Sequence, residues 1–136
     1  MAVHAQLKQV DHSRFIARAD DGPAYVIDSG DEACGTTPMQ MMLMSIAACT
    51  SIDVSHILAK KRVQLAEFQV NIVGEEAQEH PQRFTKLIIE YVFHGDNLKT
   101  KALEQAIELS ETKYCCALAS VNAELESSYR IVTSNE

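Results

Sequence analysis

The sequence predicts an α+β fold in which antiparallel sheets surround long buried helices. Short segments with the period-two alternation of strands occur near both ends and in the middle of the chain, and two longer segments carry helix signals. Their order is strands, helix, strands, helix and strand, which is not the regular strand–helix alternation of parallel α/β folds. Because the chain has 136 residues, we expect one domain that spans residues 1–136.

The first three strands are expected to form an antiparallel meander. Apolar and polar residues alternate over residues 3–8, and short apolar segments follow over residues 14–18 and 24–27. Polar residues at 11–13 separate the first two segments, and the Asp-Asp-Gly-Pro sequence at 20–23 is a strong turn signal. Together these segments predict a three-stranded sheet.

The best-marked helix is expected from Pro38 to about Lys60. Thr37 supplies an N-cap, Pro38 takes the first helical position and Gln40 completes a capping box, while basic residues follow at the negative end of the helix dipole. The N-terminal half is apolar nearly all round, but its strongly apolar part, residues 39–49, is about half of the roughly 20 residues that a membrane span needs. We therefore expect a buried helix and no membrane span. A domain of this size has few elements to cover such a helix, so we expect a homodimer that buries it.

Two further strands are expected over residues 68–73 and 84–93. Alternation places one apolar set on a single face of the second strand. The members of this set are Leu87, Ile89, Tyr91 and Phe93.

A second helix is expected over residues 98–113, and a final strand over residues 121–132 with an irregularity at Ser127 and Ser128. The helix has one buried stripe at helical spacing. Its members are Leu103, Ala106, Ile107, Ser110 and Tyr114.

Charge and composition exclude several classes of function. The chain has 12 basic and 19 acidic residues, a net charge of −7, and no basic cluster, so it is a poor candidate for binding nucleic acid. Its first residues lack the basic and then apolar pattern of a signal peptide, and we expect a cytoplasmic protein. In that compartment the four cysteines (Cys34, Cys49, Cys115 and Cys116) are expected to be reduced, reactive or metal-bound rather than disulfide-bonded.

The residues alone leave the role of the cysteines open. Cys49, in the middle of the long helix, and Cys115, after the second helix, would each be ordinary packing residues in most proteins. His56 lies seven residues from Cys49, about 10 Å along a helix, so the two cannot form a catalytic dyad. Asp53 is equally well explained as a solvated or a locally hydrogen-bonded carboxylate. Neither the spacing of the cysteines nor any glycine-rich loop indicates a zinc site or a phosphate site, and we expect no metal or cofactor.

Two segments together resemble the OsmC/Ohr family of osmotically inducible and organic hydroperoxide resistance proteins, in particular its short OsmC-like branch. One is the helix that begins at Pro38 with Cys49 eleven residues later, and the other is the Lys-Tyr-Cys sequence that ends at Cys115. The resemblance implies an intertwined homodimer with two sites at its interface and a thiol peroxidase with two cysteines. It implies that Cys49 is the peroxidatic cysteine and Cys115 the resolving one, whereas Cys34 and Cys116 inherit no role.

The chain departs from the family pattern next to the helix start. Ohr-type enzymes have a glutamate directly after the proline, where this chain has Met39. That glutamate orients an activating arginine, for which Arg14 or Arg18 are the candidates, with Arg14 nearer the first turn. The implied reaction reduces an organic hydroperoxide through a sulfenate and a disulfide, and an external dithiol restores the thiols. The alternative is a non-enzymatic or redox-sensing homologue in which Met39 marks the loss of efficient turnover.

Overall fold

The computed structural model describes residues 1–135, which form two compact units. The first unit contains residues 1–42, and the second contains the chain from residue 43 onward. Each unit has a three-stranded sheet of its own.

The first unit contains the predicted meander. Strands β1 (Ala5–Asp11), β2 (Arg14–Ala19) and β3 (Ala24–Ile27) pair antiparallel in that order. His12 and Asp20 adopt left-handed backbone conformations between the strands, which short polar residues tolerate better than most. Every residue of β1 is exposed.

The long helix α1 runs from Pro38 to Lys60, as predicted. The capping box is present, because the Gln40 backbone N donates to Thr37 Oγ1 at 3.2 Å and the Thr37 backbone N donates to Gln40 Oε1 at 3.1 Å. By length and composition alone α1 could cross a membrane, a test that core helices of soluble proteins also pass. Within this chain α1 buries a single stripe with a spacing of four residues. The stripe consists of Ile46, Thr50, Val54 and Leu58.

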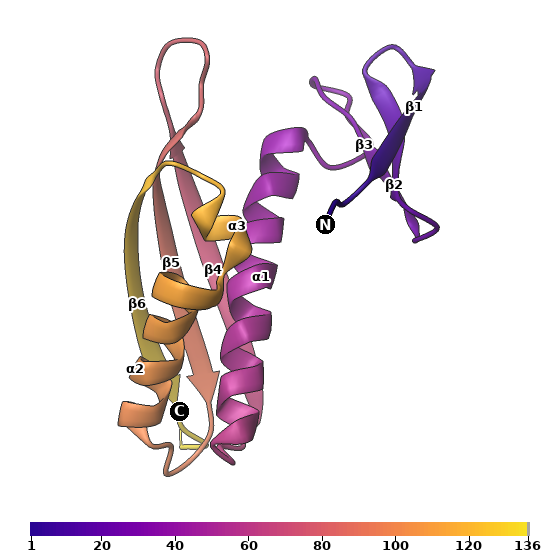
Figure 1. The fold of residues 1–136 in the computed structure, drawn as a ribbon. Coiled ribbons are helices and arrows are strands. Elements are labelled where there is room, and N and C mark those ends of the chain that lie inside the picture. The colour runs from indigo at the N-terminus through magenta and orange to yellow at the C-terminus, as the bar shows by residue number, and fades with distance from the viewer. Residues whose placement is uncertain (136) are drawn as a thin grey trace. The chain divides into compact units, whose positions relative to one another are not determined.

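The sheet of the second unit contains one antiparallel and one parallel pair (Figure 1). Strands β4 (Glu67–Glu76) and β5 (Phe84–His94) are antiparallel, whereas β6 (Glu124–Val132) lies parallel to β5. The expectation of purely antiparallel sheets is therefore wrong for β6, because the intervening helix acts as a crossover that returns the chain to the start of β5. The expected irregularity at Ser127 and Ser128 is also absent, since both residues pair with β5 in continuous register.

The second helix differs from its prediction at both ends. Helix α2 (Thr100–Leu109) begins two residues later, and it continues as a π-helical turn, Ser110–Tyr114, followed by the short helix α3 (Cys116–Ala119). The Cys115 backbone N donates to the Ser110 carbonyl at 2.8 Å, a five-residue step. This wider turn changes which side chain faces inward. Tyr114 is exposed, contrary to the prediction, and Cys115 is buried in its place.

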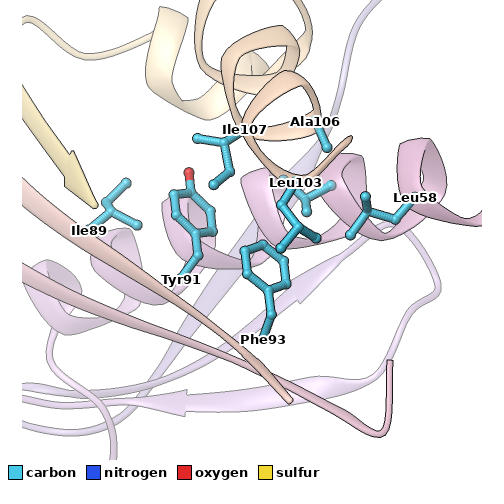
Figure 2. Close-up of a cluster of buried hydrophobic side chains, with 8 residues drawn as sticks. Leu58, Ile89, Tyr91, Phe93, Leu103, Ala106 and Ile107 are labelled. Carbon is cyan, nitrogen blue, oxygen red and sulfur yellow. The ribbon is translucent and has the colours of Figure 1, made fainter. Parts of the chain in front are cut away.

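The core of the second unit lies between β5 and the two long helices (Figure 2). The predicted apolar face of β5 is confirmed, because Ile89, Tyr91 and Phe93 are fully buried. The Phe93 ring stacks on Phe68 of β4 with centroids 4.9 Å apart. The helices contribute five residues to this cluster: Val54, Leu58, Leu103, Ala106 and Ile107. This packing holds the middle of α2 against the C-terminal half of α1.

Candidate active site

The two cysteines named from the sequence come together in the second unit. The sulfurs of Cys49 and Cys115 and a carboxylate oxygen of Asp53 all lie within 4.8 Å of one another. Cys49 and Asp53 are half-buried, and Cys115 is buried. A pair of thiols at this separation can exchange between dithiol and disulfide forms with a modest movement of the side chains.

Local structure explains how three residues from two segments meet. Cys49 and Asp53 are four residues apart on α1 and therefore lie on one face of it. The π-helical turn directs Cys115 inward instead of Tyr114. Cys115 also caps α3, because its sulfur accepts a hydrogen bond from the Leu118 backbone N at 3.5 Å.

The surroundings of Cys115 favour its neutral thiol. Burial raises the pKa of Cys115 to about 11, and the neighbouring Cys49 side chain adds to the increase, while the Leu118 N–H opposes it. Cys115 is therefore protonated at neutral pH. Any reaction in which its sulfur attacks another atom requires that a nearby group accept this proton.

A chain of polar side chains continues from Asp53 into the core. The Ser110 hydroxyl donates to Asp53 Oδ2 at 3.0 Å and contacts Thr50 Oγ1 at 2.8 Å. Thr50 Oγ1 lies 2.9 Å from the Tyr91 hydroxyl, which donates to Glu111 Oε2 at 2.7 Å. Thr50, Tyr91 and Ser110 are fully buried. Asp53 is therefore a hydrogen-bonded carboxylate, but its partner, Ser110, lies 57 residues along the chain and is not local.

Sequence reasoning missed four members of this chain. Thr50, Tyr91 and Glu111 carried no chemical assignment, and Ser110 was assigned only to the apolar stripe of α2. One signal was available: a serine on a stripe predicted to be buried needs a polar partner. The identity of that partner depends on which elements pack together, and the sequence pattern does not specify this.

The first unit holds both candidates for the activating arginine, Arg14 and Arg18. Arg14 Nε donates to Asp28 Oδ2 at 2.9 Å, and Asp28 also accepts from the Ser13 hydroxyl and from the Ser29 backbone N. The Arg14 guanidinium is the main reason that the pKa of Asp28 lies far below its usual range. The alternative, Arg18, is exposed. An approach of either arginine to Cys49 stays a prediction.

The other two cysteines differ from Cys49 and Cys115 because both are exposed. Cys34 is exposed, and its backbone N donates to Asp28 at 3.2 Å. Cys116 is exposed directly after the buried Cys115. His56 is exposed on α1, which agrees with the exclusion of a catalytic dyad.

The three-residue cluster also offers ligand atoms that a metal ion could use. Two thiolates and one carboxylate are donors that Zn²⁺ accepts, with a fourth position left for water. The spacing argument from sequence did not consider the set Cys49, Asp53 and Cys115, because Cys115 lies far along the chain. The absence of a metal stays a prediction.

A hollow of about 310 Å³ lies beside Cys115. Its apolar lining includes Leu118, Val121 and Leu125, and Glu111 and Lys113 also line it. Aliphatic and charged side chains therefore share the lining of this hollow.

Comparison with known proteins identifies relatives over nearly the whole chain. The family model described as OsmC-like protein matches residues 29–129. Protein YhfA of Escherichia coli strain K12 is 34% identical over 136 residues, which cover 98% of this chain and 97% of YhfA. A hypothetical protein from Aquifex aeolicus VF5 has a crystal structure with a TM-score of 0.89 and 30% identity, and the match covers 98% of both chains.

A more distant structure shares the fold alone. It is the organic hydroperoxide resistance protein OsmC from Legionella pneumophila, with a TM-score of 0.70 and 14% identity. The match covers 95% of this chain and 96% of that chain. The Aquifex and Legionella structures therefore share the α+β fold of this chain.

Proposed function

The chain belongs to the OsmC-like protein family, and on that premise we propose that it is a thiol-dependent peroxidase that reduces organic hydroperoxides. The observation that carries the proposal is the proximity of the Cys49 and Cys115 sulfurs, since a two-cysteine cycle requires both at one site. Several structural relatives are named organic hydroperoxide resistance proteins, which supports this class of substrate.

The burial of the two thiols supports a division of roles. Cys49 is the more accessible of the pair, and its thiolate attacks the distal oxygen of ROOH. The O–O bond breaks, the sulfur is oxidised by two electrons to the sulfenic acid, and the alkoxide takes one proton to leave as alcohol. The Cys115 sulfur then attacks the Cys49 sulfur, the S–O bond breaks, and water leaves as the disulfide forms. An external dithiol reduces this disulfide and regenerates both thiols.

The aliphatic side chains of Leu118, Val121 and Leu125 in the hollow beside Cys115 support an organic rather than an inorganic peroxide. Aliphatic side chains stabilise a bound alkyl or aryl group by excluding water, and hydrogen peroxide has no such group. The reaction uses no cofactor in this proposal, and the cytoplasm supplies the reducing dithiol.

A redox sensor or binding protein is the second candidate. Met39 favours it, because the glutamate that orients the activating arginine in Ohr-type enzymes is missing at that position. Such a protein would oxidise once and then persist as a disulfide instead of turning over.

We also propose that the protein is a homodimer. In the first unit Leu7, Val10, Ile16, Tyr25 and Val26 are each at least 41% exposed. A three-stranded sheet with this much exposed apolar surface needs a cover to be stable. On α1, Met42, Met44 and Ile52 are likewise at least 41% exposed. Sedimentation of a stable monomer at micromolar concentration would refute the dimer.

Titration of the reduced protein with cumene hydroperoxide tests the function. The peroxidase is expected to lose two thiols per chain at low equivalents, to yield a Cys49–Cys115 crosslinked peptide, and to turn over repeatedly with excess dithiothreitol. A sensor would lose the thiols without sustained turnover, and a binding protein would lose none at large excess.

Two variants separate the roles of the thiols. Cys49→Ser is expected to abolish peroxide consumption, because a serine hydroxyl supplies no thiolate to attack the peroxide oxygen at neutral pH. Cys115→Ser is expected to permit the first attack and then stall, so that dimedone traps the sulfenate. The matched control is Cys116→Ser, which removes an exposed neighbour and should leave the cycle intact. Equal activity of the wild type and Cys49→Ser would end the scheme.

A further inference from the structure

The buried polar chain that begins at Asp53 has no part in the steps described above. It connects five side chains through four oxygen–oxygen contacts of 2.7 to 3.0 Å. One end lies beside the two sulfurs, and the three hydroxyl groups in the middle are closed to solvent. Figure 2 shows the central tyrosine rising from β5 toward α2, with its hydroxyl group at the tip.

The number of protons in this chain is one short of the number of contacts. Ser110 donates its proton to Asp53, and Tyr91 donates its proton to Glu111. The Ser110 and Tyr91 protons are thus both directed away from Thr50. Thr50 has one proton, so it can donate to only one of these two hydroxyl oxygens. With both carboxylates ionised, one buried pair of oxygens faces each other without a proton between them.

One additional proton on either carboxyl group completes the chain. If Glu111 carries it, every group donates toward Asp53, and if Asp53 carries it, every group donates toward Glu111. Both arrangements satisfy all four contacts. They differ only in which end holds the proton, and a concerted shift of four protons converts one into the other.

We propose that this chain is a proton relay for the two thiols, in which Asp53 accepts and returns thiol protons and the hydroxyl groups of Ser110, Thr50 and Tyr91 connect it to Glu111. The proposal rests on the proposed peroxidase function for its substrate. Its proton path rests on the geometry of the buried chain.

The far end of the relay reaches solvent. Glu111 lines a surface hollow of about 260 Å³ together with Ser127 and Tyr129. The Ser127 hydroxyl donates to the second carboxylate oxygen of Glu111 at 2.9 Å and holds it in place. A proton that arrives at Glu111 can therefore pass to water on this side of the molecule.

Each step of the cycle gives the relay a defined task. When the Cys49 thiol ionises, its proton moves to Asp53, and the shift along the chain releases one proton from Glu111. When the thiolate cleaves the O–O bond, Glu111 takes a proton from water, and the reverse shift delivers one through Asp53 to the alkoxide. In the second step Cys115 gives its proton to Asp53 as its sulfur attacks the sulfenic acid. That proton then joins the departing hydroxide to form water, and the oxidation of the Cys115 sulfur is balanced by the reduction of the sulfenic sulfur of Cys49.

Removal of the central hydroxyl group tests the relay. Thr50→Val keeps the shape of the side chain and interrupts the chain, and Thr50→Ser restores the hydroxyl group. Thr85→Val is the matched control, because it makes the same substitution outside the relay, at a hydroxyl group that donates to the Glu75 carbonyl at 3.1 Å. The measured quantity is the rate of Cys49–Cys115 disulfide formation, by rapid quench and mass spectrometry, in H₂O and in D₂O.

Two oxidants separate this proposal from the proposed function. Cumene hydroperoxide tests both, whereas diamide, an azo compound that takes two electrons and two protons from a dithiol, tests the relay without a peroxide. A wild type that reacts with diamide but not with the hydroperoxide refutes the peroxidase and leaves the relay measurable.

With either oxidant Thr50→Val is expected to be slower by roughly tenfold or more, within the range of general acid–base effects, and to show a smaller solvent isotope effect. Thr50→Ser is expected to recover the wild-type rate and isotope effect, and Thr85→Val to keep them. The relay is overturned if folded Thr50→Val matches the wild type, or if Thr50→Ser is as slow as Thr50→Val. If Thr50→Val does not fold, Glu111→Gln replaces it, since glutamine cannot accept the proton at the surface end. Wild-type kinetics in Glu111→Gln would equally overturn the relay.

Discussion

Slow alkylation of Cys115 is the most direct consequence of its burial. Burial raises the pKa of this thiol from 9.0 to about 11, and iodoacetamide reacts with the thiolate only. Two pKa units reduce the thiolate fraction about 100-fold at any pH well below 9. Cys115 should therefore react about 100 times more slowly than a cysteine with the usual pKa, before any effect of steric protection.

The pH profile separates the pKa from steric protection. Pulse labelling with iodoacetamide and mass spectrometry of the peptides should show a rate at Cys115 that rises about tenfold per pH unit until about pH 11. Cys116, its exposed neighbour on the same peptide, is the internal control for the reagent. Because burial is the largest cause of the shift, Cys49→Ala should leave most of it in place. A profile that levels off near pH 9 would refute the reasoning, since steric protection lowers a rate without moving its midpoint.

The raised pKa of Cys115 also predicts that the free energy of unfolding falls at alkaline pH. The folded pKa of Cys115 lies above the unfolded one, so the folded state holds the proton more tightly. The associated stability is complete below pH 9 and is lost as the pH rises toward 11. Its upper limit is about 2.7 kcal/mol, from two pKa units at 1.36 kcal/mol each.

Three further substitutions test the packing and the charges. Phe93→Ala should lower the free energy of unfolding by about 3–5 kcal/mol in chemical denaturation, because it removes a fully buried ring, and a loss below about 1 kcal/mol would contradict the described core. Gly74→Ala should cost about 1–3 kcal/mol in the same assay, because the new Cβ would lie 2.5 Å from the Phe84 ring. Asp28→Asn should be destabilising at neutral pH, and because the folded pKa of Asp28 is lowered, its advantage over asparagine should shrink as the pH falls below about 4. A stability difference that does not change with pH would contradict the role assigned to the Arg14–Asp28 pair.

Local signals in the sequence identified most of the fold. The start of α1 follows from residues 37–40, because a capping box and an N1 proline act within one turn. The apolar face of β5 follows from its alternation, and the meander follows from two polar breaks. The direction of β6 could not be predicted in this way, since strand pairing depends on where the crossover helix returns the chain rather than on the residues of the strand.

The candidate site also contains residues that the sequence indicated and residues that only the packing of the elements brings together. The helix that begins at Pro38 and the Lys-Tyr-Cys segment resemble the OsmC/Ohr family, and this resemblance indicated Cys49 and Cys115. The structure brings their sulfurs together. Asp53 was noticed without a role, and the hydroxyl groups beyond it were missed. These groups come from α1, β5 and the end of α2, so they become a chain only when three elements pack. A helical pattern of 3.6 residues also gave the wrong inward side chain after Ser110, because the backbone there is wider than an α-helix.

The π-helical turn amounts to one extra residue accommodated in the last turn of a helix, just before the extended backbone of Cys115. Substitutions within residues 110–114 change side chains but keep the number of residues between Ser110 and Cys115. Deletion of one residue would let the turn close into an α-helix and rotate the next side chain by about 100° about the axis. The meeting of the two sulfurs is therefore encoded in the length of this segment. Libraries made of substitutions alone do not sample that property, whereas single-residue deletions probe it directly.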